Sequence, residues 1–265
     1  MLTLNSVSKT FNPGTVNENK VLENLSLTLN DGDFVTMIGG NGAGKSTILN
    51  LIAGVYPSDS GTVILDDINL TKLPEYRRAE YIGRVFQDPM KGTAADMEIE
   101  ENLAMANRRG KSRSLRWGIT DEERVMFHHE LQSFDLGLEN RLHDKVGLLS
   151  GGQRQTLTLL MASFQNPKLL LLDEHTAALD PKTAKKVLDL TERIIDRSNL
   201  TALMVTHNMR DAIAYGNRLI MMYEGKIILD VCKEEKQNLT VEYLLKKIEE
   251  AIGEELSDDK ALLSK

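Results

Sequence analysis

The residues GGNGAGKST, from Gly39 to Thr47, have the types and spacing of a loop that holds phosphate groups. They fit the pattern G-x-x-x-x-G-K-[ST] and lie between an expected strand, FVTMIGG, and an expected helix from Lys45 to about Ala53. Glycines let backbone N–H groups approach phosphate oxygens closely. Lys45 can reach the β- and γ-phosphates of a nucleotide, and the Ser46 hydroxyl is placed for Mg²⁺. The residues expected to contact the nucleotide are Gly39, Asn41, Gly42, Ala43, Gly44, Lys45, Ser46 and Thr47.

A second segment, LLLLDE from Leu169 to Glu174, is an apolar strand that ends in two acids. Side chains alternate along a strand, so the two carboxylates point in different directions where it ends. We assign Asp173 to the Mg²⁺ shell and Glu174 to polarising or deprotonating an attacking water. Solvated acids after a buried strand are common on their own, and it is the accompanying phosphate loop that favours the catalytic interpretation.

Polar residues also follow two other predicted core strands. Gln87, in VFQDP, can contact Mg²⁺ or the water and can move with the helical region that begins after it, which suits a coupling role. His207, in LMVTHNM, can donate to a γ-phosphate oxygen. The other histidines show no metal-ligand spacing backed by partners, and we expect surface or structural roles for them; they are His128, His129, His143 and His175.

The segment LLSGGQRQ opens a helix without offering a base, a nucleophile or a lysine. Ser150 is a plausible N-cap, and Gln153 to Phe164 carries apolar residues at helical spacing. A helix start of this kind directs several N–H groups and the positive end of the helix dipole outward. The sequence therefore predicts a second anion-holding segment at Ser150, Gly151, Gly152 and Gln153.

The elements that must position these residues alternate along the chain. Short strands fill the first third, helix-forming stretches dominate from Pro89 to Phe164, and strands and helices alternate again from Lys168 to Val231. This order predicts an α/β fold with a mainly parallel sheet, of the P-loop NTPase type, with an N-terminal antiparallel β subdomain and an inserted helical subdomain.

We expect the whole chain, 1–265, to be one domain. Its core comprises 1–87 and 156–235, its helical subdomain 88–155 and its C-terminal helical tail 236–265. The tail has Val241, Leu244, Leu245, Ile248 and Ile252 on one face, and it either docks on the core or frays beyond Gly253.

Composition narrows the class further. The apolar fraction of 41% is ordinary for a soluble globular protein, and no apolar run approaches the length that crosses a bilayer. The N-terminus lacks the apolar region of a signal peptide. The single cysteine, Cys232, excludes an internal disulfide framework and favours a reducing compartment, and we expect it to be packed at a strand end.

A net charge of −7 argues against nucleic acid as the main partner. The local exception is the basic run RRGKSRSLRW, from Arg108 to Trp117. It fits a solvated loop, a contact with anionic lipid or an acidic partner, or RNA binding, for which one short run without a second patch is little support.

In this order the motifs resemble those of the ATP-binding subunits of ABC transporters, over nearly the whole chain. The matching residues are Walker A at Gly39 to Ser46, the Q-loop at Gln87, the signature LSGGQ at Leu149 to Gln153, Walker B at Leu169 to Asp173 with Glu174 after it, the D-loop AALD at Ala177 to Asp180, and the switch His207. The resemblance implies that Asp180 contributes to the ATP site and that Phe11 stacks on adenine, where Tyr is usual. The chain departs from the pattern at Gly40, where Pro or Ser is frequent, and at His175, where Pro commonly follows the glutamate.

The resemblance also implies a head-to-tail dimer. In such proteins each ATP lies between the P-loop of one chain and the signature of the other. The sequence is consistent with this arrangement, because it has two phosphate-holding segments but only one P-loop lysine and one carboxylate pair. Two identical chains then make two complete sites.

The function that the resemblance implies is hydrolysis of ATP with Mg²⁺ to drive transport through a separate integral-membrane permease, at the cytoplasmic face of the cell membrane. A binding protein is then an indirect partner. Two segments, QDPMKGTAADMEIEENLAMA and LLLLDEHTAALDPKTA, are similar in sequence to importer ATPases whose binding proteins are thought to take amino acids. Import of an aromatic amino acid, with tryptophan as the first choice, is the resulting prediction. The alternatives are an exporter subunit and a soluble ATP-driven dimerisation switch.

Overall fold

The computed structural model describes residues 1–111, 118–133 and 137–263, with side chains as far as residue 253. The backbone falls into two compact units. One comprises residues 1–73 and 203–265, and the other residues 74–202. The predicted helical subdomain, 88–155, falls inside the second unit.

The first unit begins with an antiparallel sheet in the order β2-β1-β4-β5. Its strands are β1 (Leu2–Phe11), β2 (Asn19–Leu29), β4 (Ser60–Leu65) and β5 (Ile68–Asn69). Leu2 and Leu4 are buried while Asn5 is exposed, the alternation of a strand with one face packed and one face wet. This sheet is the predicted antiparallel β subdomain.

A second sheet in this unit carries the strand that leads into the phosphate loop. Strand β3 (Phe34–Gly39) pairs parallel with β9 (Arg218–Tyr223), and β9 pairs antiparallel with β10 (Lys226–Cys232). Strand β8 (Thr201–Val205), whose last three residues belong to this unit, is next to β3 in the strand order. The helices of the unit are α1 (Lys45–Ala53), α7 (Met209–Ala214), α8 (Lys233–Gln237) and α9 (Val241–Leu263).

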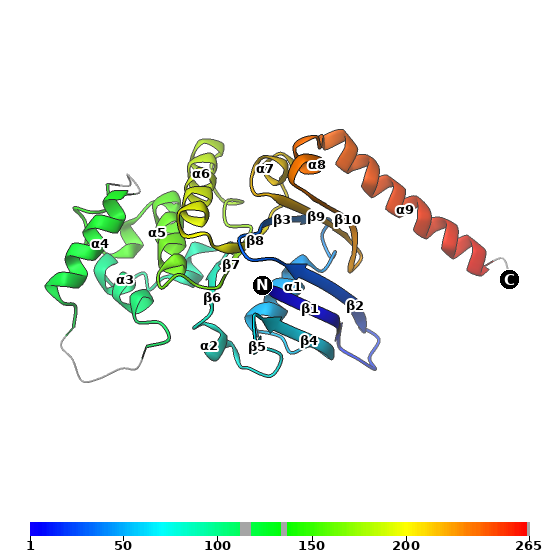
Figure 1. Cartoon of the computed structure of the whole chain (residues 1–265), viewed down its shortest axis with the longest axis horizontal. Helices are drawn as coiled ribbons and strands as arrows, with labels where there is room; N and C mark the ends of the chain where they lie inside the picture. The colour runs from blue at the N-terminus through cyan, green and yellow to red at the C-terminus, as the bar shows by residue number, and fades with distance from the viewer. Residues whose placement is uncertain (112–117, 134–136, 264–265) are drawn as a thin grey trace. The chain divides into compact units, whose positions relative to one another are not determined.

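The C-terminal helix α9 docks through its first turns. Leu244 is fully buried in a cluster with Ile38 and Met221, and Ile248 packs against the same cluster. The helix continues past Gly253 to Leu263, and Figure 1 shows this end extending away from β10. Cys232 is exposed at the end of β10, so the expectation that it is packed is wrong. It is the last residue of an edge strand, where only one neighbouring strand covers it.

The second unit joins a parallel strand pair to a group of helices. Strands β6 (Ile82–Val85) and β7 (Leu169–Asp173) pair in parallel, with Ile82 opposite Leu169. The helices are α2 (Glu75–Arg78), α3 (Ile99–Asn107), α4 (Asp121–Ser133), α5 (Gly151–Ser163) and α6 (Pro181–Ser198), with short 3-10 turns at Pro89–Gly92 and Val146–Leu148. Residues of α3, α4 and α5 share one apolar cluster that includes Leu103, Phe127 and Leu157, and Figure 1 shows these three helices together.

A short backbone ladder ties the two ends of this helical group. The N–H of Gly147 donates to the carbonyl of Ala95 at 2.8 Å, and that of Val146 to Met97 at 3.0 Å. Glu100 N–H donates in turn to Leu142 at 3.0 Å. The segment that leads into α3 is therefore paired with the segment that leads to α5.

The predicted fold class is confirmed. The described residues contain parallel strand pairs, a separate antiparallel sheet and a run of helices between β6 and β7. Among these residues we find no helix with the length and apolar character needed to span a membrane.

Replacing Gly83 with alanine tests the packing of α5 on β6. An added Cβ would overlap the backbone carbonyl oxygen of Ala162, on α5, and backbone cannot move aside cheaply. We expect Gly83→Ala to lower the free energy of unfolding by about 2 kcal/mol, measured by urea denaturation. Gly118→Ala, where no atom lies within 4 Å of the added carbon, is the control. Equal stability of the two variants would contradict this packing.

Candidate active site

The predicted phosphate loop joins β3 to α1 with backbone that requires glycine. At Gly39 an added Cβ would overlap the carbonyl oxygen of Met222 on the neighbouring strand. Gly42 and Gly44 have positive φ angles of 82° and 94°, and Gly44 is the residue that caps α1. The Gly225 N–H, in the turn between β9 and β10, donates to the Ala43 carbonyl at 3.2 Å and so ties the loop to that turn. The outer residues Gly40 to Gly42 are exposed, so a ligand can reach their backbone.

Lys45 lies inside this loop and is only 5% exposed. Its ammonium group donates to the carbonyl oxygens of Gly39 and Gly40, both at 2.8 Å. An ammonium group has three donors and a flexible stem, so a small movement can redirect it to phosphate oxygens. The next residue, Ser46, is exposed in the first turn of α1, where N–H groups have no partner within the helix. The arrangement can hold an anion by charge, by backbone N–H groups and by a hydroxyl.

His207 lies at the carboxyl end of β8, beside the end of β3. The preceding Thr206 donates its N–H to Met37 at 3.1 Å, two residues before Gly39. The following Asn208 caps α7 by accepting from the N–H groups of Arg210 and Asp211. His207 is exposed between these two fixed points. Its position at a strand end agrees with the predicted role toward a phosphate.

Phe11, the predicted base-stacking residue, ends β1 and has an aromatic neighbour that the sequence did not suggest. The ring of Tyr56 packs edge-on against it, with centroids 5.2 Å apart. The Lys9 ammonium lies 5.6 Å from the Phe11 ring centre and pairs with Asp59 at 2.9 Å. Both rings are half-buried, so Tyr56 joins Phe11 as a candidate contact for a base.

In the second unit, the carboxyl ends of β6 and β7 bring three predicted residues together. The Gln87 amide donates to the Glu174 carboxylate at 3.3 Å. The Arg84 guanidinium lies 3.4 Å from the Asp173 carboxylate and 4.7 Å from the Phe86 ring centre. Sequence analysis missed Arg84, although a charged residue inside the apolar strand IGRV is a signal that a partner lies beside it.

The predicted metal ligands carry donor atoms of the kind that Mg²⁺ binds. Asp173 offers a carboxylate oxygen and Gln87 an amide oxygen in the second unit, and Ser46 offers a hydroxyl oxygen in the first. Asp173 and Gln87 follow neighbouring parallel strands, and Ser46 belongs to the other unit.

The signature segment forms a helix start, as the sequence predicts. Ser150 caps α5: its hydroxyl accepts from the Gln153 N–H at 3.3 Å, and the Gln153 side chain accepts from the Ser150 N–H at 3.2 Å. An added Cβ at Gly152 would overlap the Thr183 methyl group on α6. Asp180 caps α6 by accepting from the Thr183 N–H at 3.1 Å, and hydrogen bonds from Thr183 lower the pKa of its carboxyl. The starts of α5 and α6 therefore lie side by side.

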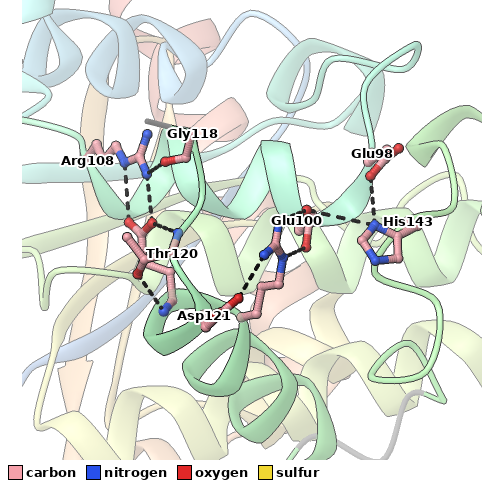
Figure 2. A network of polar contacts seen from close by, with 9 residues as sticks. Glu98, Glu100, Arg108, Gly118, Thr120, Asp121 and His143 are labelled. Atoms are coloured by element: carbon pink, nitrogen blue, oxygen red, sulfur yellow. Dashed lines mark hydrogen bonds and ion pairs between the residues drawn. The ribbon is translucent and has the colours of Figure 1, made fainter. Parts of the chain in front are cut away.

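Several charged residues of the helical region contact one another in a polar network (Figure 2). His143 Nδ1 lies 3.0 Å from a Glu98 oxygen and 3.8 Å from a Glu100 oxygen. These three form the one group of metal-ligand type found among the described residues. Arg124 on α4 holds the buried Glu100 carboxylate of α3 at 3.0 Å. We therefore assign the network to joining α3, α4 and the 142–147 segment.

The basic run begins with two arginines that are engaged internally. Arg108 donates to the Glu123 carboxylate at 2.7 Å. It also donates to the Gly118 carbonyl, as Figure 2 shows. Arg109 donates to the carbonyls of Ala162 and Phe164 at the end of α5. These contacts favour a structural role for both side chains. Residues 112–117 lie outside the described residues.

These features are typical of a P-loop nucleotide hydrolase: a glycine-rich loop after β3, two acids after β7, and parallel strand pairs. A family model described as ABC transporter matches residues 22–177. The chain is 47% identical over 252 residues to the tyrosine transport ATP-binding protein of Clostridioides difficile (strain R20291), covering 95% of this chain and 100% of that one. It is 32% identical over 231 residues to the methionine import ATP-binding protein MetN of Bartonella henselae (strain ATCC 49882), covering 86% of this chain and 64% of that one.

A solved structure agrees with these sequence matches. A dimeric ATP-binding cassette in a post-hydrolysis state, bound to ADP and Pi, is 30% identical, with a TM-score of 0.74, covering 88% of this chain and 98% of that one. The chain belongs to the ABC transporter family, as an ATP-binding subunit that hydrolyses ATP.

Lys45→Ala tests the phosphate loop. Removing the ammonium group takes away the one positive charge inside the loop, so we expect at least a roughly tenfold loss of affinity for a fluorescent ATP analogue with Mg²⁺. Lys72→Ala, at an exposed lysine of the same unit, should bind as the unaltered protein does. Tight, Mg²⁺-dependent binding by Lys45→Ala would show that this loop does not hold the phosphates.

Proposed function

We propose that this chain powers the import of an aromatic amino acid through a separate integral-membrane permease. The proposed substrate class rests on the similarity, along 95% of the chain, to a protein named for tyrosine transport. The similarity to a methionine import protein favours import over export. Tyrosine and tryptophan share an aromatic ring and an α-amino acid group, and the transported molecule contacts the permease and its binding protein rather than this subunit. The proposed location is accordingly the cytoplasmic face of the membrane, held by the permease.

The proposed site needs two copies of the chain. Lys45, Ser46 and the loop amides of one copy hold the phosphates, and Ser150 with the start of α5 in the second copy closes over them. The dimeric structure of a similar cassette supports this arrangement. The chain itself supports it too, because the segment at Ser150 has an N-capped helix start but no lysine of the P-loop kind, and its Arg154 donates to the carbonyls of Val146 and Gly147. In the proposed site the lysine that meets the phosphates therefore comes from the other copy.

In the proposed reaction Glu174 acts as the general base. Its carboxylate takes a proton from the attacking water, the water oxygen attacks the γ-phosphorus, and the bond to the β–γ bridging oxygen breaks. Lys45 and His207 stabilise the negative charge that develops on the γ-phosphoryl oxygens. Asp173, Gln87 and Ser46 hold Mg²⁺, which supplies charge neutralisation at the phosphates when it is bound. Phe11 and Tyr56 contact the adenine ring of ATP, and Asp180 supports the site through the start of α6.

Coupling to transport runs through Gln87. Its amide touches the Glu174 carboxylate at 3.3 Å, and the helical region begins directly after it. A change at the site can therefore reach residues 88–105, where we place the permease contact. ATP drives the cycle because it binds the closed dimer more tightly than the open one.

Glu174→Gln separates binding from hydrolysis. The amide cannot accept the proton of the water, so we expect the hydrolysis rate to fall at least a hundredfold while ATP binding is retained. The variant should accumulate as a dimer with ATP, measured by light scattering. Adding Ser150→Arg should abolish that dimer and leave ATP binding intact, whereas Ser133→Arg, at an exposed serine on α4, should keep the dimer. Near-normal turnover by Glu174→Gln would exclude it as the base.

Uptake by cells tests the substrate. Cells that lack this chain should take up labelled tyrosine or tryptophan several-fold more slowly than cells supplied with it, because the permease then has no ATPase. Supplying Glu174→Gln should not restore uptake. Methionine and lysine uptake serve as controls. If uptake of these two falls and aromatic uptake does not, the substrate class is wrong.

A further inference from the structure

His175, the residue directly after Glu174, is buried and tied to a helix. Its side chain is 2% exposed, and its Nε2 lies 3.1 Å from the Thr191 hydroxyl on α6. Thr191 is fully buried as well. Burial lowers the pKa of the imidazole to about 4, so the ring is neutral near pH 7.

The direction of this hydrogen bond follows from the hydroxyl proton. The Thr191 hydroxyl donates to the carbonyl of Val187, one turn earlier in α6, at 2.8 Å. A hydroxyl has one proton to donate, so Thr191 accepts from the imidazole. The imidazole Nε2 therefore carries the proton of this hydrogen bond. His175 is thus the donor and the Thr191 hydroxyl the acceptor, so the bond is lost when either side chain is replaced by an apolar one.

Glu174 itself has a backbone conformation that its neighbours must enforce. Its φ angle of +46° lies in the left-handed region, which costs free energy for any residue with a Cβ. On one side, β7 fixes the chain through its pairing with β6. On the other, Ala177 N–H donates to the Glu174 carbonyl at 3.0 Å, which closes a turn. His175 lies inside that turn, and its ring is the side-chain link from the turn to α6.

We propose that His175 is a positioning residue for Glu174, acting through its hydrogen bond to Thr191. The bond holds the turn after β7 against α6 and thereby keeps the Glu174 carboxylate in the direction that hydrolysis needs. The proposal rests on the proposed role of Glu174 as the base. In this proposal the buried His175 side chain keeps rigid the turn that carries Glu174.

Thr191→Val removes the acceptor and preserves the side-chain shape. We expect kcat to fall roughly fivefold to tenfold, the loss of one hydrogen bond to a neutral group, while KM for ATP and the affinity for a fluorescent ATP analogue stay within about twofold. Rates are expressed per nucleotide-binding site, so that unfolded protein does not count. A merely structural role would lower thermal stability without changing this normalised kcat.

Two variants serve as controls. Thr191→Ser keeps the hydroxyl, so it should retain kcat. Thr158→Val makes the same change at a buried threonine of α5, whose hydroxyl donates to the Arg154 carbonyl at 2.8 Å, one turn earlier, and has no histidine against it. It should leave normalised kcat unchanged. A loss in Thr158→Val equal to that in Thr191→Val would overturn the proposal.

The double variant His175→Leu with Thr191→Val separates stability from positioning. Replacing both partners by apolar groups leaves no buried donor unpaired, so the fold should regain stability even where Thr191→Val alone is poorly folded. The proposal expects kcat to stay low in the double variant, and recovery of both stability and kcat would overturn it. If Glu174→Gln abolishes turnover while the double variant turns over normally, the proposed function holds and only this inference fails. If Glu174→Gln turns over normally, the base assignment has failed instead.

Discussion

The close approach of Gly39 to the carbonyl of Met222 is the constraint on which the phosphate loop depends. The parallel pairing of β3 with β9 puts these two backbones in contact, and only a residue without Cβ fits there. The chain can then leave the sheet at once, turn through Gly42 and Gly44, and start α1 at Lys45. The backbone of Gly40 to Gly44, Lys45 and Ser46 takes its position from that exit. Strand β3 is buried from Phe34 to Ile38, so the loop leaves the sheet from a well-packed strand.

In the second unit the predicted catalytic residues follow the ends of two neighbouring strands. Asp173 and Glu174 follow a buried strand, and Gln87 follows the neighbouring parallel strand. Side-chain contacts accompany these strand ends: Arg84 contacts Asp173, Gln87 contacts Glu174, and His175 contacts Thr191 on α6. Capped starts of α5 and α6 lie beside each other because Gly152 leaves room for Thr183. The backbone ladder between residues 95–100 and 142–147 joins the region after Gln87 to the start of α5.

Local signals were sufficient for much of this architecture. The bounds of α1, the N-cap at Ser150 and the strand that ends at Asp173 follow from glycines, a capping serine and an apolar run, all of which act within a few residues. The partners across space did not follow. Arg84 with Asp173, Tyr56 with Phe11 and Thr191 with His175 are separated by 89, 45 and 16 residues, and periodicity carries no information about such pairs. Cys232 was misjudged for a related reason, since the sequence does not say which strand forms the edge of a sheet.

The position of Lys45 also has a consequence for how the loop keeps its shape. A buried ammonium group needs partners that offset its desolvation cost. In this loop the carbonyls of Gly39 and Gly40 are already within 2.8 Å and accept the charge. The loop therefore offsets its own buried charge through its backbone, and the same contacts hold the lysine stem along the loop. Removing Lys45 would leave two carbonyl oxygens without this donor, so the substitution should loosen the loop as well as take away a charge.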